Sequence, residues 1–151
     1  MVTVISNSPE ETAALGERWA QTATAGMVIA VSGDLGTGKT QLAKGIARGL
    51  GYTGHVHSPT FALLNLYEGG RMPFYHLDLY RLEGVDQVIA AGLEDYLEPD
   101  GIALIEWAER WFSEASQPGP DPTRLHLKLR RVKMETLNEN VRRIDYEDFG
   151  L

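Results

Sequence analysis

Continuous apolar runs mark two places in the chain where a strand is buried on both faces. Residues 28–31 read Val-Ile-Ala-Val, and residues 102–105 read Ile-Ala-Leu-Ile. Such runs are typical of central strands in a sheet that is covered on both sides. A different pattern occurs at residues 125–129, where leucines alternate with polar or charged residues and predict a half-exposed strand.

Helical periodicity and capping signals predict two well-defined helices. Ser8 is followed by proline and then by glutamates, which is typical of a helix N-terminus, and this helix should run to about Thr24. A second helix is expected over residues 39–50, ended by Gly51. Its apolar stripe consists of Leu42, Ile46 and Leu50. A shorter helical region is expected over residues 85–97.

The remaining apolar segments predict additional strands at the edges of the sheet. They lie at residues 2–5, 61–67, 74–79 and 141–146. Gly69-Gly70 would join the second and third of these in a hairpin, and the fourth could pair with residues 125–129. We therefore predict a single α/β domain over residues 1–151, with a central mixed sheet flanked by helices. A C-terminal hairpin at about 123–147 would pack on the same domain.

A glycine-rich loop joins the strand at 28–31 to the helix at 39–50. Its residues match the phosphate-binding pattern G-x-x-x-x-G-K-[ST] and are Gly33, Asp34, Leu35, Gly36, Thr37, Gly38, Lys39 and Thr40. Loop amides and the helix N-terminus would bind phosphate, with Lys39 at the β- and γ-phosphates and the Thr40 hydroxyl on Mg²⁺. An incidental glycine turn is disfavoured because strand, loop and helix all fall where the mechanism needs them. The domain is thus predicted to be P-loop NTPase-like.

A P-loop needs a further acid for the metal, usually at the carboxyl end of a buried strand. Glu106 directly follows the apolar run at 102–105 and fits this position. Asp78 is a second candidate, in His76-Leu77-Asp78-Leu79-Tyr80-Arg81, where His76, Asp78 and Tyr80 would share a strand face. The alternative for Asp78 is a surface carboxylate paired with Arg81.

Two further residues have both a functional and a structural interpretation. Thr60, in Ser58-Pro59-Thr60-Phe61, could be a switch threonine that senses the γ-phosphate and metal, or belong to a turn before a strand. Trp107 could lie near bound nucleotide because it adjoins Glu106, or form a core stripe with Trp111. Both alternatives stay open.

Composition and charge exclude several other classes of function. There are no cysteines, so disulfides, thiolate metal sites and cysteine nucleophiles are excluded. We see no secretory signal and no apolar run as long as a membrane span, so we expect a cytoplasmic protein without membrane contact. The net charge of −7 argues against unaided nucleic-acid binding.

The charge is unevenly distributed along the chain. Residues 82–109 hold eight acids and no Lys or Arg, whereas residues 124–143 hold seven of the fourteen Lys and Arg. These segments could simply be two solvated surfaces. Alternatively, they could be an acidic face for a basic partner and a basic edge near phosphates.

Taken together, the motifs resemble those of the TsaE (YjeE) P-loop ATPases of bacterial tRNA modification. The most particular ones are Ser58-Pro59-Thr60-Phe61, His76-Leu77-Asp78-Leu79-Tyr80-Arg81 and Glu106-Trp107, in order after the P-loop. Residues 15–18 and 92–96 also match, so the resemblance covers roughly residues 8–130 and leaves the C-terminal hairpin without a family motif.

The resemblance implies an ATPase that assists the TsaD–TsaB complex in forming threonylcarbamoyladenosine on tRNA next to the anticodon. ATP turnover would reset the partner complex, and tRNA would be met mainly through it. Lys39 would bind phosphate, Thr40 and Glu106 would bind Mg²⁺, Asp78 would be needed for hydrolysis, and Thr60 would act in a switch-like loop. An arginine that stabilises the transition state could be Arg81 or come from a partner.

Two other functions stay open at this point. A small-molecule kinase of the P-loop class is disfavoured because residues 108–122 hold only Arg110, too few arginines for a phosphoryl-clamping lid. A nucleotide-dependent binding module without essential hydrolysis differs from the ATPase only in whether Asp78 is needed. A GTPase is disfavoured because the chain contains no N-K-x-D or T-K-x-D stretch.

Overall fold

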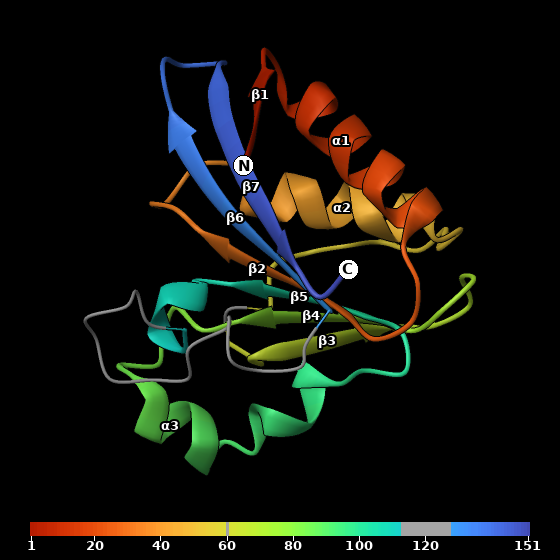
Figure 1. Ribbon diagram of the computed structural model, residues 1–151, viewed down its shortest axis with the longest axis vertical. Coiled ribbons are helices and arrows are strands. Elements are labelled where there is room, and N and C mark those ends of the chain that lie inside the picture. The colour runs from red at the N-terminus through yellow and green to blue at the C-terminus, as the bar shows by residue number, and fades with distance from the viewer. Residues whose placement is uncertain (60, 113–127) are drawn as a thin grey trace.

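The computed structural model describes residues 1–59, 61–112 and 128–151 and shows a seven-stranded sheet with helices on both faces (Figure 1). The strands are β1 (Val2–Ser6), β2 (Met27–Ser32), β3 (Leu64–Tyr67), β4 (Phe74–Asp78), β5 (Ile102–Glu106), β6 (Lys128–Thr136) and β7 (Arg142–Phe149). The helices are α1 (Pro9–Thr22), α2 (Lys39–Gly49) and α3 (Val85–Ala90), with 3₁₀ helices η1 (Leu93–Leu97) and η2 (Ala108–Arg110). The predicted α/β class with a mixed sheet is confirmed.

The sheet is parallel in the middle and antiparallel at both edges. Its strand order is β1-β7-β6-β2-β5-β4-β3. β2 pairs in parallel with both β5 and β6, and β5 pairs in parallel with β4, while the outer pairs are antiparallel. The carboxyl ends of β2, β4, β5 and β6 therefore meet at one edge of the sheet, where open α/β sheets bind ligands.

The continuous apolar run in β2 is explained by burial on two sides. Met27, Ile29 and Val31 belong to the core cluster that includes α1 and α2, whereas Val28 and Ala30 belong to the cluster on the opposite face. All five residues are at most 3% exposed. β2 is thus fixed from both faces, which holds the loop that follows it in place.

α1 and α2 cross so closely that their backbones touch. A Cβ atom at Gly45 of α2 would lie 1.8 Å from the carbonyl oxygen of Ala13 in α1. Cβ atoms at Gly16 and Gly49 would each lie 2.5 Å from a backbone oxygen of the facing helix. These glycines are required for this helix crossing, because the atoms that a side chain would meet belong to backbone and cannot rotate away.

Several element boundaries differ from the sequence predictions. The strand expected at 61–67 begins only at Leu64, because the N–H groups of Ala62 and Leu63 donate to the Pro59 carbonyl in a turn. The helical region at 85–97 is divided into α3 and η1 by Gly92, whose φ is +74°.

The other boundaries shift by a few residues or extend beyond the prediction. α1 ends at Thr22 instead of Thr24, α2 ends at Gly49, and β7 continues to Phe149. β6 runs through Lys128–Thr136, so the strand extends well past residue 129, while residues 113–127 lie outside the described part.

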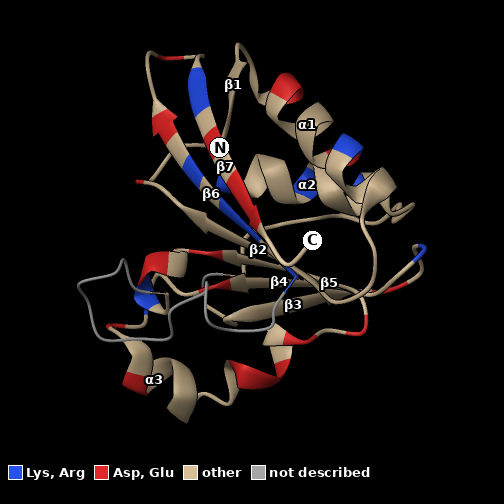
Figure 2. Cartoon of the chain, viewed as in Figure 1, with Lys and Arg blue, Asp and Glu red and all other residues tan. Residues whose placement is uncertain are grey.

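Figure 2 shows acidic residues along α3 and the segment that follows it, and both basic and acidic residues on β6 and β7. The acidic residues of α3 and η1 are exposed, whereas Glu106 is buried. On β6 and β7, three basic residues form ion pairs with neighbouring acids: Arg130 with Asp148, Lys133 with Glu135 and Arg143 with Asp145. For these three residues the local pairing is consistent with a solvated surface. In the described residues, no helix combines the length and the apolar character needed to cross a bilayer.

Candidate nucleotide site

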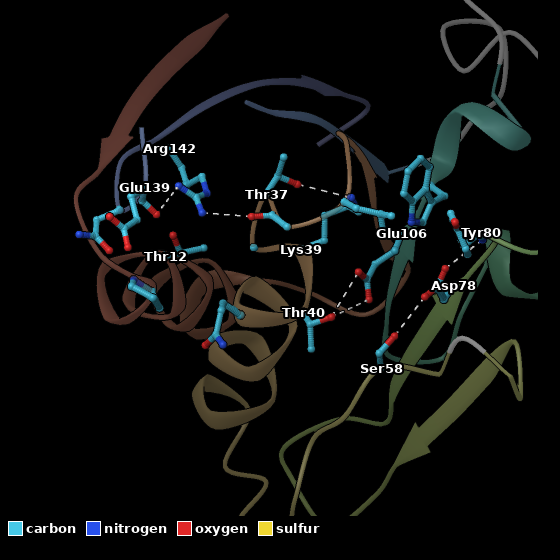
Figure 3. A pocket seen from close by; sticks show the side chains of 17 residues that line it. Thr12, Thr37, Lys39, Thr40, Ser58, Asp78, Tyr80, Glu106, Glu139 and Arg142 are labelled. Carbon is cyan, nitrogen blue, oxygen red and sulfur yellow. Dashed lines mark hydrogen bonds between the residues drawn. The ribbon is translucent and has the colours of Figure 1, made fainter. Parts of the chain in front are cut away.

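A cavity of about 430 Å³ lies at the carboxyl edge of the parallel strands. The loop between β2 and α2 and the start of α2 form its middle, residues 35–41. Figure 3 shows Asp78, Glu106 and Tyr80 at one end of this cavity and Thr12, Glu139 and Arg142 at the other, with Lys39 and Thr37 between them. The cavity is therefore elongated across the P-loop, with chemically different ends.

Three glycines of the P-loop have a backbone conformation that favours glycine. Gly33, Gly36 and Gly38 have φ values of +149°, +78° and +97°, which L-amino acids with side chains rarely adopt. Gly38 is the N-cap of α2 and has no side chain to cap the helix. The first N–H groups of α2, together with the positive end of the helix dipole, can therefore serve an anion.

The Lys39 side chain lies inside the P-loop and is bound to loop carbonyls. Its Nζ donates to the carbonyl oxygens of Gly33 at 2.6 Å and Asp34 at 2.7 Å, and it lies 4.4 Å from the ring centroid of Trp107. Burial lowers the pKa of Lys39, an effect opposed by nearby carboxylates, of which Glu106 is the strongest. The cation is thus partly desolvated, which strengthens its interaction with a bound anion.

Thr40 and Glu106 bring oxygen atoms together at one end of the cavity. The Thr40 hydroxyl lies 3.4 and 3.5 Å from the two carboxylate oxygens of Glu106. Glu106 ends β5, is 3% exposed, and also contacts Nε2 of the fully buried His76 on β4. A hydroxyl and a carboxylate close together are hard oxygen donors of the kind that Mg²⁺ prefers, so these residues fit the metal.

Asp78 lies beside Glu106 because of the strand register. The Cα atoms of these residues are partners in the parallel pairing of β4 and β5. Asp78 accepts a hydrogen bond from the Ser58 hydroxyl at 3.1 Å and another from the Tyr80 backbone N–H at 2.9 Å. Asp78 is 3% exposed, so the alternative of a surface carboxylate is wrong. The Arg81 guanidinium lies over the Phe61 ring, 4.7 Å from its centroid.

The structure brings most of the predicted site residues together. Leu35, Gly36, Thr37, Gly38, Lys39, Thr40, Asp78, Glu106 and Trp107 line the cavity, while Gly33 and Asp34 bind Lys39 through their carbonyls. Trp107 fits both of its interpretations, because it lines the cavity and is also partly buried against the core cluster that contains Trp111. Thr60 lies outside the described residues, so its role stays a prediction.

Sequence reasoning assigned no individual role to two residues at this site, His76 and Arg142. His76 was placed on the strand face of Asp78 but given no role, and its contact with Glu106 depends on pairing between β4 and β5. Arg142 was counted only among the basic residues at 124–143, which could form a basic edge near phosphates, and its Nη2 donates to the Gly36 carbonyl at 3.1 Å. Arg142 and Gly36 are 106 positions apart, and no sequence pattern indicates the contact between them.

Comparisons with known proteins show that the chain is similar to one protein family. The family described as "Threonylcarbamoyl adenosine biosynthesis protein TsaE" matches residues 6–143. The tRNA threonylcarbamoyladenosine biosynthesis protein TsaE of Nostoc sp. is 47% identical over 73% of this chain and 70% of its own length. The Bacillus subtilis protein of the same name is 46% identical over 67% of this chain, which spans 63% of that relative. The crystal structure of Bacillus subtilis YdiB superposes with a TM-score of 0.74 at 30% identity, covering 99% of this chain and 86% of that one.

Proposed function

The chain belongs to the TsaE family of threonylcarbamoyl adenosine biosynthesis proteins, and from this premise we propose that it is a Mg²⁺-dependent ATPase serving that tRNA modification. The observation that carries the proposal is the arrangement of Glu106 and Asp78 on neighbouring strands, at one end of a cavity whose middle is the P-loop. Binding alone would require the P-loop, whereas two buried carboxylates beside it supply what hydrolysis requires.

The P-loop residues bind the triphosphate and neutralise part of its charge. Backbone N–H groups around Gly36 and Gly38 would donate to the β-phosphate, and the start of α2 adds its dipole. Lys39 would exchange its bonds to the loop carbonyls for bonds to the β- and γ-phosphates. Each of these interactions strengthens as charge develops on the phosphate oxygens in the transition state.

Thr40 and Glu106 would hold Mg²⁺, and His76 would keep the Glu106 carboxylate oriented. When bound, the ion supplies positive charge that stabilises the oxygens of the transferred phosphoryl group. The buried position of Glu106 excludes water from one side of the carboxylate and limits the orientations it can adopt.

Asp78 would position the water that attacks the γ-phosphate and accept its proton. The hydrogen bonds from Ser58 and from the Tyr80 backbone fix the carboxylate in the plane needed for this task. The proposal is supported by the strand register, in which Asp78 lies beside Glu106, the residue that would hold the metal next to the γ-phosphate. Thr60 would act in the switch-like loop that adjoins Ser58.

The partner reaction explains why so small an ATPase is useful. Threonylcarbamoyl transfer would be performed by TsaD–TsaB, while ATP turnover by this protein resets that complex between rounds. The tRNA would be met mainly through the complex, in keeping with the net charge of −7. We propose that the protein acts in the cytoplasm together with this complex.

The test is ATP hydrolysis by the protein alone and then with TsaD–TsaB and tRNA. We expect clear activation by the partners, and loss of nucleotide binding in Lys39→Ala. Asp78→Asn should keep ADP binding but lower turnover by about 10²–10⁴-fold, the usual contribution of a general base. Glu68→Gln is the control, because it removes an exposed carboxylate just after β3.

Two results would contradict the proposal. Normal turnover in Asp78→Asn would remove the assigned catalytic role and favour a binding module. Turnover that the partners leave unchanged would argue against a role in their cycle.

A further inference from the structure

The loop before β3, residues 58–63, is attached to the end of β4 at both of its own ends. At the start of the loop, the Ser58 hydroxyl donates to the Asp78 carboxylate at 3.1 Å (Figure 3). At its other end, the Leu63 carbonyl accepts from the Asp78 backbone N–H at 2.9 Å. The position of the carboxylate proposed to act in hydrolysis therefore depends on how this loop is held.

The end of this loop has a backbone conformation that its residues do not prefer. The Pro59 carbonyl accepts from the N–H groups of Ala62 and Leu63, at 3.1 and 2.8 Å. Leu63 has a φ of +66°, in the left-handed region that residues with side chains rarely adopt. Such a conformation persists only where the surrounding contacts hold it in place. Contacts between the loop and its neighbours are therefore needed to keep its shape.

Phe61 lies between the two attachments and provides a third contact with the segment after β4. Its side chain is 84% exposed, so the hydrophobic core does not fix it. The Arg81 guanidinium lies over the Phe61 ring, with Cζ 4.7 Å from the ring centroid. A cation within about 6 Å of an aromatic face is attracted by the quadrupole of the ring. Arg81 can therefore hold the middle of the loop.

Arg81 is a suitable anchor for the loop because the backbone beside it is fixed to the core. Leu79 is fully buried, donates its N–H to the Glu106 carbonyl at 3.1 Å and accepts from the Leu82 N–H at 3.0 Å. The turn that contains Arg81 therefore follows β4 at a defined position. Among the described residues, no carboxylate forms an ion pair with Arg81, and its guanidinium contacts the Phe61 ring instead.

Arg81 could act in hydrolysis directly or through the loop, and the geometry favours the second. A catalytic arginine would contact the transferred phosphoryl group. The described residues that line the cavity do not include Arg81, and the guanidinium is engaged on the Phe61 ring. The contact that Arg81 does make leads to Asp78, through the loop that carries Ser58 and Leu63.

We propose that Arg81 is a positioning residue for ATP hydrolysis, which stacks on Phe61 to hold the loop before β3 against the end of β4 and so keeps Asp78 in place. The inference rests on the proposed ATPase function and adds to it the contact that orders the catalytic carboxylate. It also gives the exposed Phe61 ring a function. An arginine that stabilises the transition state would then have to come from a partner.

The experiment measures kcat and KM for ATP hydrolysis by the full-length protein, with the partner proteins and tRNA of the preceding test, and ADP affinity by calorimetry. Arg81→Gln removes the cation and Phe61→Leu removes the ring. Each should lower kcat about three- to tenfold and leave ADP affinity within about twofold. The double variant should lose no more than either single variant, because both changes break the same contact. Loss of an arginine that acts on the transition state would instead lower kcat by about 10³–10⁵-fold.

Conservative variants and a matched control separate this role from an effect on folding. Phe61→Tyr keeps an aromatic ring and should turn over like the wild type, and Arg81→Lys keeps a cation and should recover part of the loss. Arg143→Gln is the control, since this exposed arginine pairs with Asp145 and is not among the described residues that line the cavity. All variants should unfold at the urea concentration of the wild type, because Phe61 and Arg81 are both exposed.

The inference is overturned if Arg81→Gln and Phe61→Leu both turn over like the wild type, or if their losses multiply in the double variant. It is also overturned if Arg81→Gln loses 10³-fold or more while Phe61→Leu is unaffected, or if ADP affinity falls as much as kcat. The proposed function fails separately, through normal turnover in Asp78→Asn. Low turnover in Asp78→Asn beside unaffected Arg81 and Phe61 variants would retain that function and remove only the inference.

Discussion

Replacing His76 by phenylalanine should separate metal binding from nucleotide binding. His76 is fully buried and its ring lies parallel to that of Phe74, with centroids 6.0 Å apart, so a phenylalanine ring can take its place. The change removes the Nε2 contact with Glu106. In the described part of the chain, His76 Nδ1 has no hydrogen-bond partner, so no second bond is lost there.

The size of the effect follows from what remains at Glu106. Thr40 would still lie 3.4 and 3.5 Å from the carboxylate, but the buried partner that orients the acid would be gone. Loss of a hydrogen bond to a charged group costs about 1.5–3 kcal/mol. Removing such an outer partner of a metal ligand typically lowers metal affinity or activity by roughly 10–100-fold. We expect a loss in this range for Mg²⁺ in the ADP complex.

The assay is a Mg²⁺ titration of the ADP complex, with ADP binding in EDTA measured in parallel. His76→Phe should weaken the Mg²⁺ dependence and leave ADP affinity in EDTA within about twofold, because Lys39 and the loop amides are unchanged. His57→Phe is the control, since His57 is exposed. His76→Gln should recover part of the loss through its amide donor. Equal loss with and without Mg²⁺, or an unchanged Mg²⁺ dependence, would refute the positioning role.

Three other changes probe packing and electrostatics. Gly45→Ala should lower the free energy of unfolding by about 2–4 kcal/mol in urea denaturation, because the clash with the α1 backbone outweighs a helix-propensity gain of about 1 kcal/mol. Gly84→Ala, in open space, should change it by less than about 0.5 kcal/mol, and equal effects would contradict the argument. Burial lowers the pKa of Lys39, and a bound anion favours the protonated amine, so ADP binding at alkaline pH should be accompanied by proton uptake. Calorimetry in buffers of different ionisation enthalpy measures this uptake, and its absence would contradict the argument. A hydrogen bond from the Thr3 side chain on β1 lowers the pKa of Asp145 from its usual 3.8. Asp145→Asn should therefore lower the free energy of unfolding at pH 7, and lower it progressively less as the pH falls below 3.8. A loss that is independent of pH in urea denaturation would contradict this expectation.

The central part of the fold could be predicted from sequence because its signals are local. Residues 28–40 contain a buried strand, a glycine loop and a helix start in one continuous stretch, and the structure places them as expected. Glu106 could be located in the same way, because an acid directly after a buried apolar strand must lie at the edge of a sheet. The position of Glu106 at the carboxyl end of β5 therefore followed from strand boundaries alone.

The contacts across the sheet could not be predicted, because they depend on register and strand order. The pairing of Asp78 with Glu106 requires β4 beside β5, and a shift of one residue would turn His76 away from Glu106. Arg142 reaches Gly36 because the β6–β7 turn lies beside the P-loop, and the sequence contains nothing that specifies this approach.

The negative charge of the protein is compatible with the proposed binding of a triphosphate, and the reason lies in the site itself. Asp34, Asp78, Glu106 and Glu109 all act electrostatically on Lys39, so the cavity itself is rich in acid. A triphosphate can bind there only if attraction is supplied at short range, by loop amides, the α2 N-terminus and a divalent cation. The net charge of −7 therefore disfavours the long-range approach of the protein to nucleic acid. It does not determine whether an anion binds at the P-loop, because short-range contacts dominate there. If ATP binds as proposed, the γ-phosphate would face the two buried carboxylates of Asp78 and Glu106, and a cation would be needed to offset their charge.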